Sequence, residues 1–128
     1  MRQEPLIEHG ITSDVIGAFF EVYNNLGLGF LEFIYSLALE EELLKKNRTV
    51  GREVNVPVLY KGKVLTTQRV DMIIDDKVLI EIKSTPVLPP TARRQTLNYL
   101  RVTTLEVALL LHFGPEAKFY RVVHTKSA

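Results

Sequence analysis

Apolar residues recur three or four positions apart in the first third of the chain, at Val15, Phe19, Val22 and Leu26. This spacing predicts a helix with one buried face. We expect a residue within 12–14 to cap its start, and Gly27 and Gly29 to end it. A second helix is predicted over residues 31–46, with an acidic residue, Glu32, near its start and lysines at its end, as the helix dipole favours.

The middle and the end of the chain contain short apolar segments, which predict strands. Residues 53–60, 64–74 and 78–83 are rich in valine, leucine and isoleucine, and polar turns separate them. After several prolines, a third helix is predicted over 91–102, followed by strands over 105–113 and 119–124. This order predicts an α/β fold whose mixed sheet contains an antiparallel meander and a crossover helix.

Two neighbouring predicted strands gather charged residues at one end of an apolar hairpin. If the turn between them has three residues, Asp71 lies opposite Glu81. One face then carries only apolar side chains, namely Val70, Met72, Ile74, Val78, Ile80 and Ile82, and the charged end of the other face carries Arg69, Asp71, Glu81 and Lys83. A two-residue turn would shift the register and scatter this cluster, so the three-residue turn is the better prediction.

The paired carboxylates allow two interpretations. Opposed strand residues have Cβ atoms roughly 5 Å apart, and two carboxylates at that separation repel each other unless a cation such as Mg²⁺ lies between them. Lys83 points the same way as Glu81 and could orient an attacking water or stabilise charge at a scissile phosphate. The alternative is two edge salt bridges, Arg69 with Asp71 and Glu81 with Lys83. The apolar character of residues 78–83 favours a central strand, where buried charge must be paired or metal-bound.

The composition narrows the class of protein. The 128 residues are 46% hydrophobic and 24% charged, so we expect one folded domain over residues 1–128. The absence of cysteine excludes a disulfide scaffold, thiolate catalysis and a Cys-ligated zinc site. No apolar run is long enough for a membrane span or a secretion signal, and we expect a cytoplasmic protein. The net charge of +1 neither supports nor excludes a nucleic-acid partner.

Four segments together resemble one known family. Asp71, followed after nine residues by Glu81-Ile82-Lys83, resembles the core motif of the PD-(D/E)xK nuclease superfamily. Residues 29–35 match the motif that names the GxxExxY protein family, a branch of that superfamily. Residues 95–100 resemble its Q-x-x-x-Y element, and residues 109–114 resemble its usual last core strand. The resemblance covers nearly the whole chain and implies a restriction-endonuclease-like core, with a mixed central sheet flanked by helices.

The resemblance also implies roles for single residues. The ligands of a Mg²⁺ or Mn²⁺ ion would be the carboxylates of Glu32, Asp71 and Glu81, with the Ile82 carbonyl as a further ligand. Lys83 would be the catalytic lysine. The residues implied at the substrate backbone or beside the site are Gln95, Tyr99 and Arg69. The chain departs from the family before the glutamine, where Arg94 replaces a smaller residue, and before Asp71, where the lead-in proline is absent.

Other residues allow a structural as well as a functional interpretation. Tyr35 lies one turn after Glu32 and either bonds to it or packs in the core, and Gly29 lets the chain turn into the helix. His9, His112 and His124 show no metal-ligand spacing and are expected to be ordinary surface or strand residues. Arg93, Arg94 and Arg101 give the third helix a basic side, which is either a solvated face or a contact for phosphates.

These observations predict a Mg²⁺- or Mn²⁺-dependent nuclease acting on DNA or RNA. The residues expected to carry catalysis are Glu32, Asp71, Glu81 and Lys83. Two alternatives stay open: a non-catalytic nucleic-acid-binding or regulatory module that keeps the fold, and an interaction protein that forms a homodimer through a sheet edge or a helix face.

Overall fold

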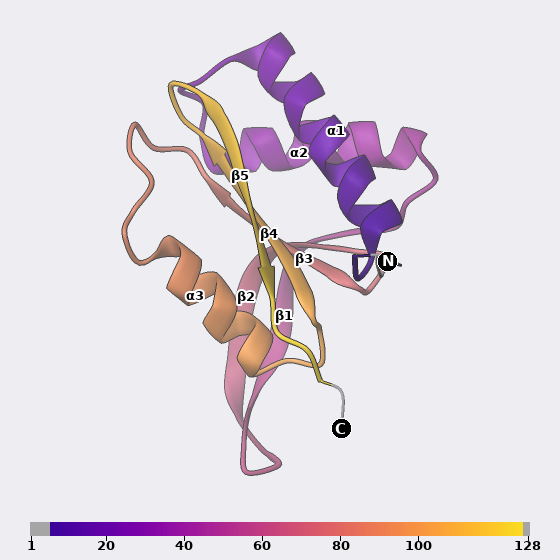
Figure 1. Cartoon of the computed structure of the whole chain (residues 1–128), viewed down its shortest axis with the longest axis vertical. Coiled ribbons are helices and arrows are strands. Elements are labelled where there is room, and N and C mark those ends of the chain that lie inside the picture. The colour runs from indigo at the N-terminus through magenta and orange to yellow at the C-terminus, as the bar shows by residue number, and fades with distance from the viewer. Residues whose placement is uncertain (1–5, 127–128) are drawn as a thin grey trace, which may run out of the picture.

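The protein consists of one mixed sheet with helices on both of its faces (Figure 1). The computed structural model describes residues 6–126; residues 1–5, part of the stretch expected to lack a secretion signal, and residues 127–128 lie outside the described residues. The described helices are α1 (His9–Leu26), α2 (Glu32–Lys45) and α3 (Ala92–Arg101), and the strands are β1 (Val50–Tyr60), β2 (Lys63–Ile74), β3 (Val78–Lys83), β4 (Val107–Phe113) and β5 (Ala117–Val123).

The strands lie in the order in which they occur along the chain, β1-β2-β3-β4-β5. Three strands form an antiparallel meander, β3 and β4 are parallel, and β5 returns antiparallel to β4. A parallel pair needs a long connection, and α3 supplies it. The predicted α/β fold with a mixed sheet and a crossover helix is therefore confirmed. Within residues 6–126, none of the helices is both long and apolar enough to cross a bilayer.

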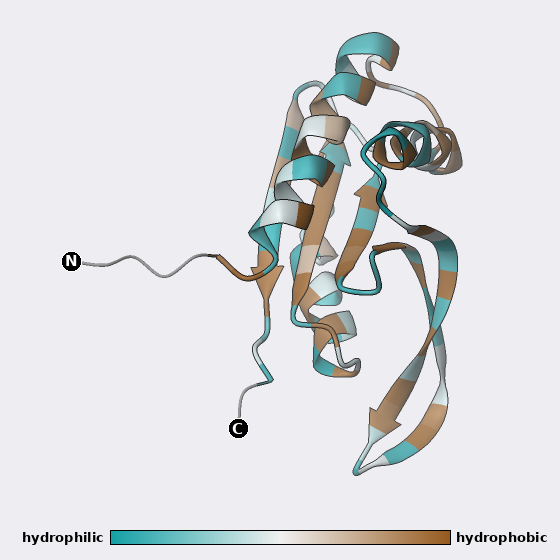
Figure 2. Ribbon diagram, turned by 90° about the vertical axis from the view of Figure 1, so that its right-hand side faces the viewer, coloured by the Kyte–Doolittle hydropathy of each residue, from teal (hydrophilic) through white to brown (hydrophobic). Residues whose placement is uncertain are grey.

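Helices lie on both faces of the sheet, α1 and α2 on one face and α3 on the other (Figures 1 and 2), and each face has its own core. α1 and α2 cover a large cluster that includes Met72, Ile80 and Leu109. α3 covers a smaller cluster on the opposite face, where Leu100 packs with Leu79 and Ala108. Successive side chains of a strand point to opposite faces, so a central strand that is apolar at nearly every position can serve both cores.

The first helix begins earlier than the sequence predicts. α1 starts at His9, so the expected N-cap within residues 12–14 is wrong. The Thr12 hydroxyl donates to the His9 carbonyl inside the helix, and the Asp14 carboxylate accepts bonds from Arg48 instead of capping. The predicted end is confirmed, because Leu26 is the last helical residue and Gly27 follows with φ +71°.

The hairpin of β2 and β3 has the predicted three-residue turn, with Ile74 opposite Val78. Regular pairing stops at Met72 and Ile80, one position before the charged pair. Five of the six residues predicted on the apolar face do lie together in the large core, but Val70 packs in the smaller core under α3. The cause is an interruption in β1, where Glu53 adopts φ +53° opposite Asp71 and disturbs the strand alternation.

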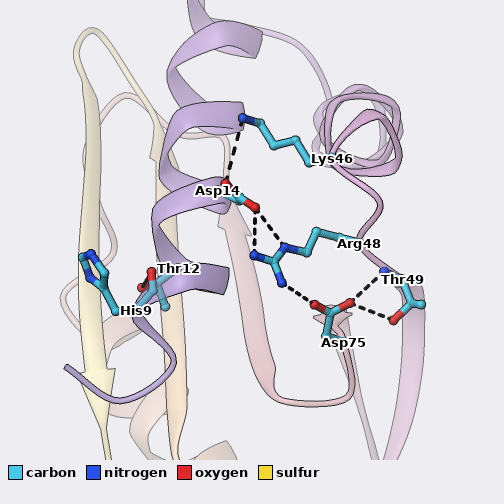
Figure 3. Close-up of polar contacts among 7 residues, drawn as sticks. All are labelled: His9, Thr12, Asp14, Lys46, Arg48, Thr49 and Asp75. Carbon is cyan, nitrogen blue, oxygen red and sulfur yellow. Dashed lines mark hydrogen bonds and ion pairs between the residues drawn. The ribbon is translucent and has the colours of Figure 1, made fainter. Parts of the chain in front are cut away.

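The side chain of Arg48 links α1 to the turn between β2 and β3, on the side of the sheet that α1 and α2 cover (Figure 3). Arg48 Nε donates to Asp14 of α1 at 2.9 Å, and its Nη1 donates to Asp75 of the β2–β3 turn at 2.9 Å. Asp75 also accepts bonds from the backbone N–H of Thr49 at 2.8 Å and from the Thr49 hydroxyl at 3.1 Å. Burial raises the pKa of Asp75, but the bonds from Thr49 and Arg48 outweigh burial and lower it overall.

We expect Arg48→Met to lower the free energy of unfolding by about 2–3 kcal/mol at pH 7, since charge-assisted bonds to two half-buried carboxylates are lost. A group whose folded pKa is depressed stabilises the fold above its unfolded pKa, and this contribution disappears as the pH falls. The difference in the free energy of unfolding between wild type and Arg48→Met should therefore shrink below about pH 3–4. Urea unfolding across that range is the measurement.

Lys45→Met, at an exposed i,i+3 pair with Glu42, is the control and should change stability by less than about 0.5 kcal/mol. A pH-independent deficit in Arg48→Met would contradict the expectation.

Candidate metal and phosphodiester site

Asp71 and Glu81 lie together where the ladder between β2 and β3 ends. The backbone N–H of Ile82 donates to Asp71 Oδ2 at 2.7 Å, and the backbone N–H of Asp71 donates to Glu81 Oε2 at 3.3 Å. Each carboxylate thus accepts a bond from the neighbouring strand at a position where regular pairing has stopped. The opposed pair that the hairpin register predicts is therefore present.

The electrostatics of the pair are those of two acids forced close together. Glu81 is 7% exposed, whereas Asp71 is half-buried. Burial, a bond with the Asp71 side chain and the Asp71 charge raise the pKa of Glu81 to about 9, against an opposing effect of Lys83. Burial and the charges of Glu81 and Asp71 also raise the pKa of Tyr99. The protein therefore does not compensate two negative charges at this point, and Glu81 keeps its proton at neutral pH when no cation is bound.

A pocket of about 180 Å³ opens beside Asp71. Four different elements contribute to its wall: α2, the interrupted part of β1, and the ends of β2 and β3. Its lining residues are Glu32, Phe33, Ser36, Arg52, Glu53, Arg69, Asp71 and Ile82. Both acidic and basic side chains face this pocket, and Arg69, which the sequence predicts beside Asp71, is among them.

Glu32 reaches the same pocket from the first turn of α2, but its carboxylate is engaged elsewhere. Glu32 Oε2 accepts a bond from the Ser84 backbone N–H at 3.3 Å. Among residues 6–126, no three histidine or acidic side chains lie close enough together to bind one metal ion. The structure thus brings Asp71 and Glu81 together and places Glu32 on the wall of the pocket rather than beside them.

The segment from Gly29 to Tyr35 builds the connection that presents Glu32. The Tyr35 hydroxyl donates to the Gly27 carbonyl at 2.6 Å and accepts from the Phe30 N–H at 3.2 Å, while its buried ring stacks on Phe113 with centroids 3.8 Å apart. Gly29 adopts φ +99°, which favours glycine. Tyr35 therefore packs and fixes the loop instead of bonding to Glu32.

Ser84 ties this loop to the end of β3. Its hydroxyl donates to the Phe30 carbonyl, and its N–H donates to Glu32. Lys83, the residue before it, is half-buried and is the last residue of β3. The motif around Gly29 and the motif around Lys83, distant in sequence, therefore meet at one point.

The α3 residues that are expected to contact substrate differ in their exposure to solvent. Tyr99 is half-buried and close enough to the acidic pair for their charges to raise its pKa. Gln95 lies one turn earlier and is exposed, as is Arg94. The neighbouring Arg93 places its guanidinium 4.9 Å from the ring centroid of Tyr120.

Glu53 is a residue of the pocket that the sequence interpretation missed. It lines the pocket and holds a left-handed backbone conformation, φ +53°, which is uncommon for a residue with a side chain. Gly51 allows the bend, since a Cβ there would come within 2.9 Å of Val54 Cγ2. A glycine two positions before an acidic residue in a valine-rich strand was the available signal, because such glycines often mark a bulge.

A larger pocket, of about 330 Å³, is lined by the β3–α3 connection and the β4–β5 hairpin. It includes His112, which is buried and bonded to the Thr85 carbonyl at 2.8 Å, and Glu116, whose side chain is 78% exposed. A ring already engaged with the backbone and a solvated carboxylate offer little for metal chemistry. The smaller pocket beside Asp71 is the better candidate site despite its volume.

Comparison with known proteins agrees with this geometry. Residues 9–122 match a family model described as the PD-(D/E)XK nuclease superfamily. No protein with a curated description matches the chain. The fold is similar to a solved structure titled "Crystal structure of SSO0001", with a TM-score of 0.55 and 24% identity over 73% of this chain and 50% of that one. The chain thus spans about half the length of that protein, and the likeness concerns the fold alone.

Proposed function

The chain belongs to the PD-(D/E)XK nuclease superfamily, and from this premise we propose that it is a Mg²⁺- or Mn²⁺-dependent nuclease that hydrolyses phosphodiester bonds in DNA or RNA. The observation that carries the proposal is the Asp71–Glu81 pair, half-buried and buried respectively, beside a pocket lined by further acids and arginines. The segment Gly29–Tyr35 is our reason to place the chain in the GxxExxY branch.

The donor chemistry of the pair suits a divalent oxygen-seeking cation. Asp71 and Glu81 offer carboxyl oxygens, and a divalent cation would take the place of the proton that the raised pKa of Glu81 retains; the Ile82 carbonyl is an additional donor under the proposal. Glu32 would join them after leaving Ser84, since its bond of 3.3 Å at an exposed position is weak. When bound, such a cation supplies Lewis-acid activation and neutralises charge at the phosphate.

The remaining residues position the substrate. The Lys83 ammonium, on the strand that carries Glu81, would hold a water in line or stabilise charge developing on the phosphate. Arg69 lines the pocket and would bind a phosphate oxygen. Tyr99 would hydrogen-bond near the pair, whereas Gln95 and Arg94, exposed on α3, would contact the substrate backbone.

Replacing the lysine tests the catalytic role directly. We expect Lys83→Gln to reduce Mn²⁺-dependent cleavage of a labelled DNA or RNA by about 10²-fold, because one preorganised donor is lost at the reacting phosphate. Mn²⁺ affinity should stay within about threefold by calorimetry, since no carboxylate ligand changes. The matched control is Lys77→Gln, on the exposed turn at the other end of β3. Cleavage that persists undiminished in Lys83→Gln would argue against the proposal.

One observation favours the alternative, a nucleic-acid-binding or regulatory module without turnover. Across the described part of the chain, three metal-binding side chains are not gathered at one point. Titration with Mn²⁺ separates the two functions: binding that requires Glu32, Asp71 and Glu81 supports the nuclease, and no binding at millimolar Mn²⁺ supports the module. Homodimer formation and a cytoplasmic location stay predictions, which sedimentation and cell fractionation would test.

A further inference from the structure

The hairpin of β1 and β2 extends beyond the rest of the sheet as a two-stranded arm, which we define as residues 55–69 (Figures 1 and 2). Its outer end carries apolar side chains in water, since Tyr60 is 58% exposed and Leu65 is 59% exposed. Leu59 and Val64 are also exposed there. A register shift between Val58 and Leu59 leaves Leu65 out of the regular pairing. These side chains do not stabilise a core, so their exposure needs another explanation.

The charged residues of the arm are all basic. The arm carries Lys61 and Lys63 at the tip and Arg69 at the base, with no acidic residue, although the whole chain has 16 Lys and Arg against 15 Asp and Glu. The Lys61 ammonium lies 5.5 Å from the ring centroid of Tyr60, so charge and aromatic surface occur together at the tip. A basic surface of this kind complements a polyanion.

The arm leads directly to the candidate site. β2 runs without a break from Lys63 at the tip through Arg69 to Asp71. Eight residues of strand span about 25 Å, which equals the rise of about seven base pairs. A polymer whose phosphate lies at Asp71 would therefore still be in reach of Lys61 and Lys63. The bend at Glu53 sits at the base of the arm and sets its direction.

We propose that the arm docks in the major groove of B-form duplex DNA and directs the duplex past Asp71. This inference rests on the proposed function, because it takes the DNA to pass the candidate site. The major groove, about 12 Å wide, admits a two-stranded β-ribbon, whereas the major groove of A-form RNA is too narrow for protein elements. The two lysines contact phosphates, and Tyr60 and Leu65 contact base edges and thymine methyl groups.

The test measures binding of a fluorescent 30-base-pair DNA in EDTA, so that cleavage does not enter. We expect Lys61→Gln/Lys63→Gln to weaken binding about tenfold at moderate salt and to lower the slope of log K against log salt by about 2, as two phosphate contacts are lost. Lys45→Gln/Lys77→Gln, with the same change of net charge at exposed positions, should bind within about twofold of wild type. Equal weakening by both double variants, or by neither, would overturn the proposal.

A second pair of variants tests the apolar tip. Tyr60→Ser/Leu65→Ser should weaken duplex DNA binding about fivefold or more while changing the unfolding midpoint by less than about 2 °C, because both side chains are exposed. Sedimentation of the free protein addresses the rival occupant, a second copy of this chain. A wild-type dimer that Tyr60→Ser/Leu65→Ser dissociates, with DNA binding unchanged, would assign the arm to self-association and refute the proposal.

The outcomes separate this inference from the proposed function. Arm-dependent binding of duplex DNA without any cleavage would uphold the arm and count against the nuclease. If the arm variants cleave duplex DNA at the wild-type rate, the proposed nuclease function is supported and the arm proposal is refuted. Duplex RNA that binds as tightly as DNA, with the same dependence on Lys61 and Lys63, would contradict docking in the major groove.

Discussion

Asp71→Asn is expected to lower Mn²⁺- or Mg²⁺-dependent cleavage by about 10³-fold or more, the largest loss of any single substitution at the site. Neutralising one of two paired carboxylates removes several kcal/mol of cation binding and transition-state stabilisation, and about 4 kcal/mol corresponds to 10³-fold in rate. The asparagine oxygen can still accept the 2.7 Å bond from the Ile82 N–H, so the fold should persist. Single-turnover cleavage of a labelled substrate at saturating protein is the measurement.

The matched control for Asp71→Asn is Asp76→Asn, on the exposed β2–β3 turn. It changes the net charge equally and should cleave at the wild-type rate. Binding of nucleic acid in EDTA should be unchanged or slightly tighter in Asp71→Asn, because a negative charge near the phosphates is gone. Loss of binding together with loss of cleavage would mean that the substitution acts through the fold, and undiminished cleavage would refute the role of Asp71 as a metal ligand.

The sequence predicted most of the elements because local signals agreed with the tertiary context. The turn Asp75-Asp76-Lys77 set the register of β2 and β3, and that register placed Asp71 opposite Glu81. The continuous apolar run of β3 indicated a strand buried on both faces, which it is. The start of α1 could not be predicted, because Asp14 serves a distant partner, Arg48, and this pairing is invisible in a local pattern.

The details of the site were less predictable, since they depend on one backbone irregularity. The left-handed Glu53 interrupts β1 opposite Asp71, adds a carboxylate to the pocket and moves Val70 to the other core. Strict alternation cannot anticipate such a change. Likewise, the bond between Glu32 and Ser84 joins residues 52 positions apart in the chain. The metal-ligand, catalytic and substrate-binding roles predicted for these and the other site residues stay predictions, namely those of Glu32, Asp71, Glu81, Ile82, Lys83, Gln95, Tyr99, Arg69 and Arg94.

The packing of Tyr35 links Glu32 on α2 to the Asp71–Glu81 pair on the strands. Tyr35 stacks on Phe113 of β4 and fixes the loop that leads into α2, whose first residue is Glu32, while Ser84 joins that loop to the end of β3. The stacking therefore determines where the helix-borne acid lies relative to the strand-borne pair. Tyr35, whose hydroxyl bonds to Gly27 and Phe30 rather than to Glu32, therefore acts on the site by holding this loop.

Glu81→Gln is expected to stabilise the protein in EDTA at pH 8 by about 2–4 kcal/mol, although it removes a site residue. Burial and Asp71 raise the pKa of Glu81 to about 9 in the folded protein, far above its ordinary value of 4.5. The folded state then binds a proton that the unfolded state does not, so wild-type stability falls as the pH rises from about 4.5 to about 9, by up to about 1.4 kcal/mol per unit. Glutamine supplies a neutral amide without this cost. Urea unfolding from pH 5 to 9 is the measurement.

Added Mn²⁺ should reverse the order of stability, because the cation favours the deprotonated pair and only the wild type retains both carboxylates. At pH 8 and millimolar Mn²⁺ the wild type should gain stability and Glu81→Gln should gain much less. Glu116→Gln, at an exposed carboxylate, should change stability by less than about 0.5 kcal/mol with or without Mn²⁺. A Glu81→Gln protein that is less stable than wild type in EDTA at every pH would show that Glu81 is ionised and compensated by Lys83, as in the salt-bridge interpretation of the hairpin, and would remove the physical reason for a cation at this position.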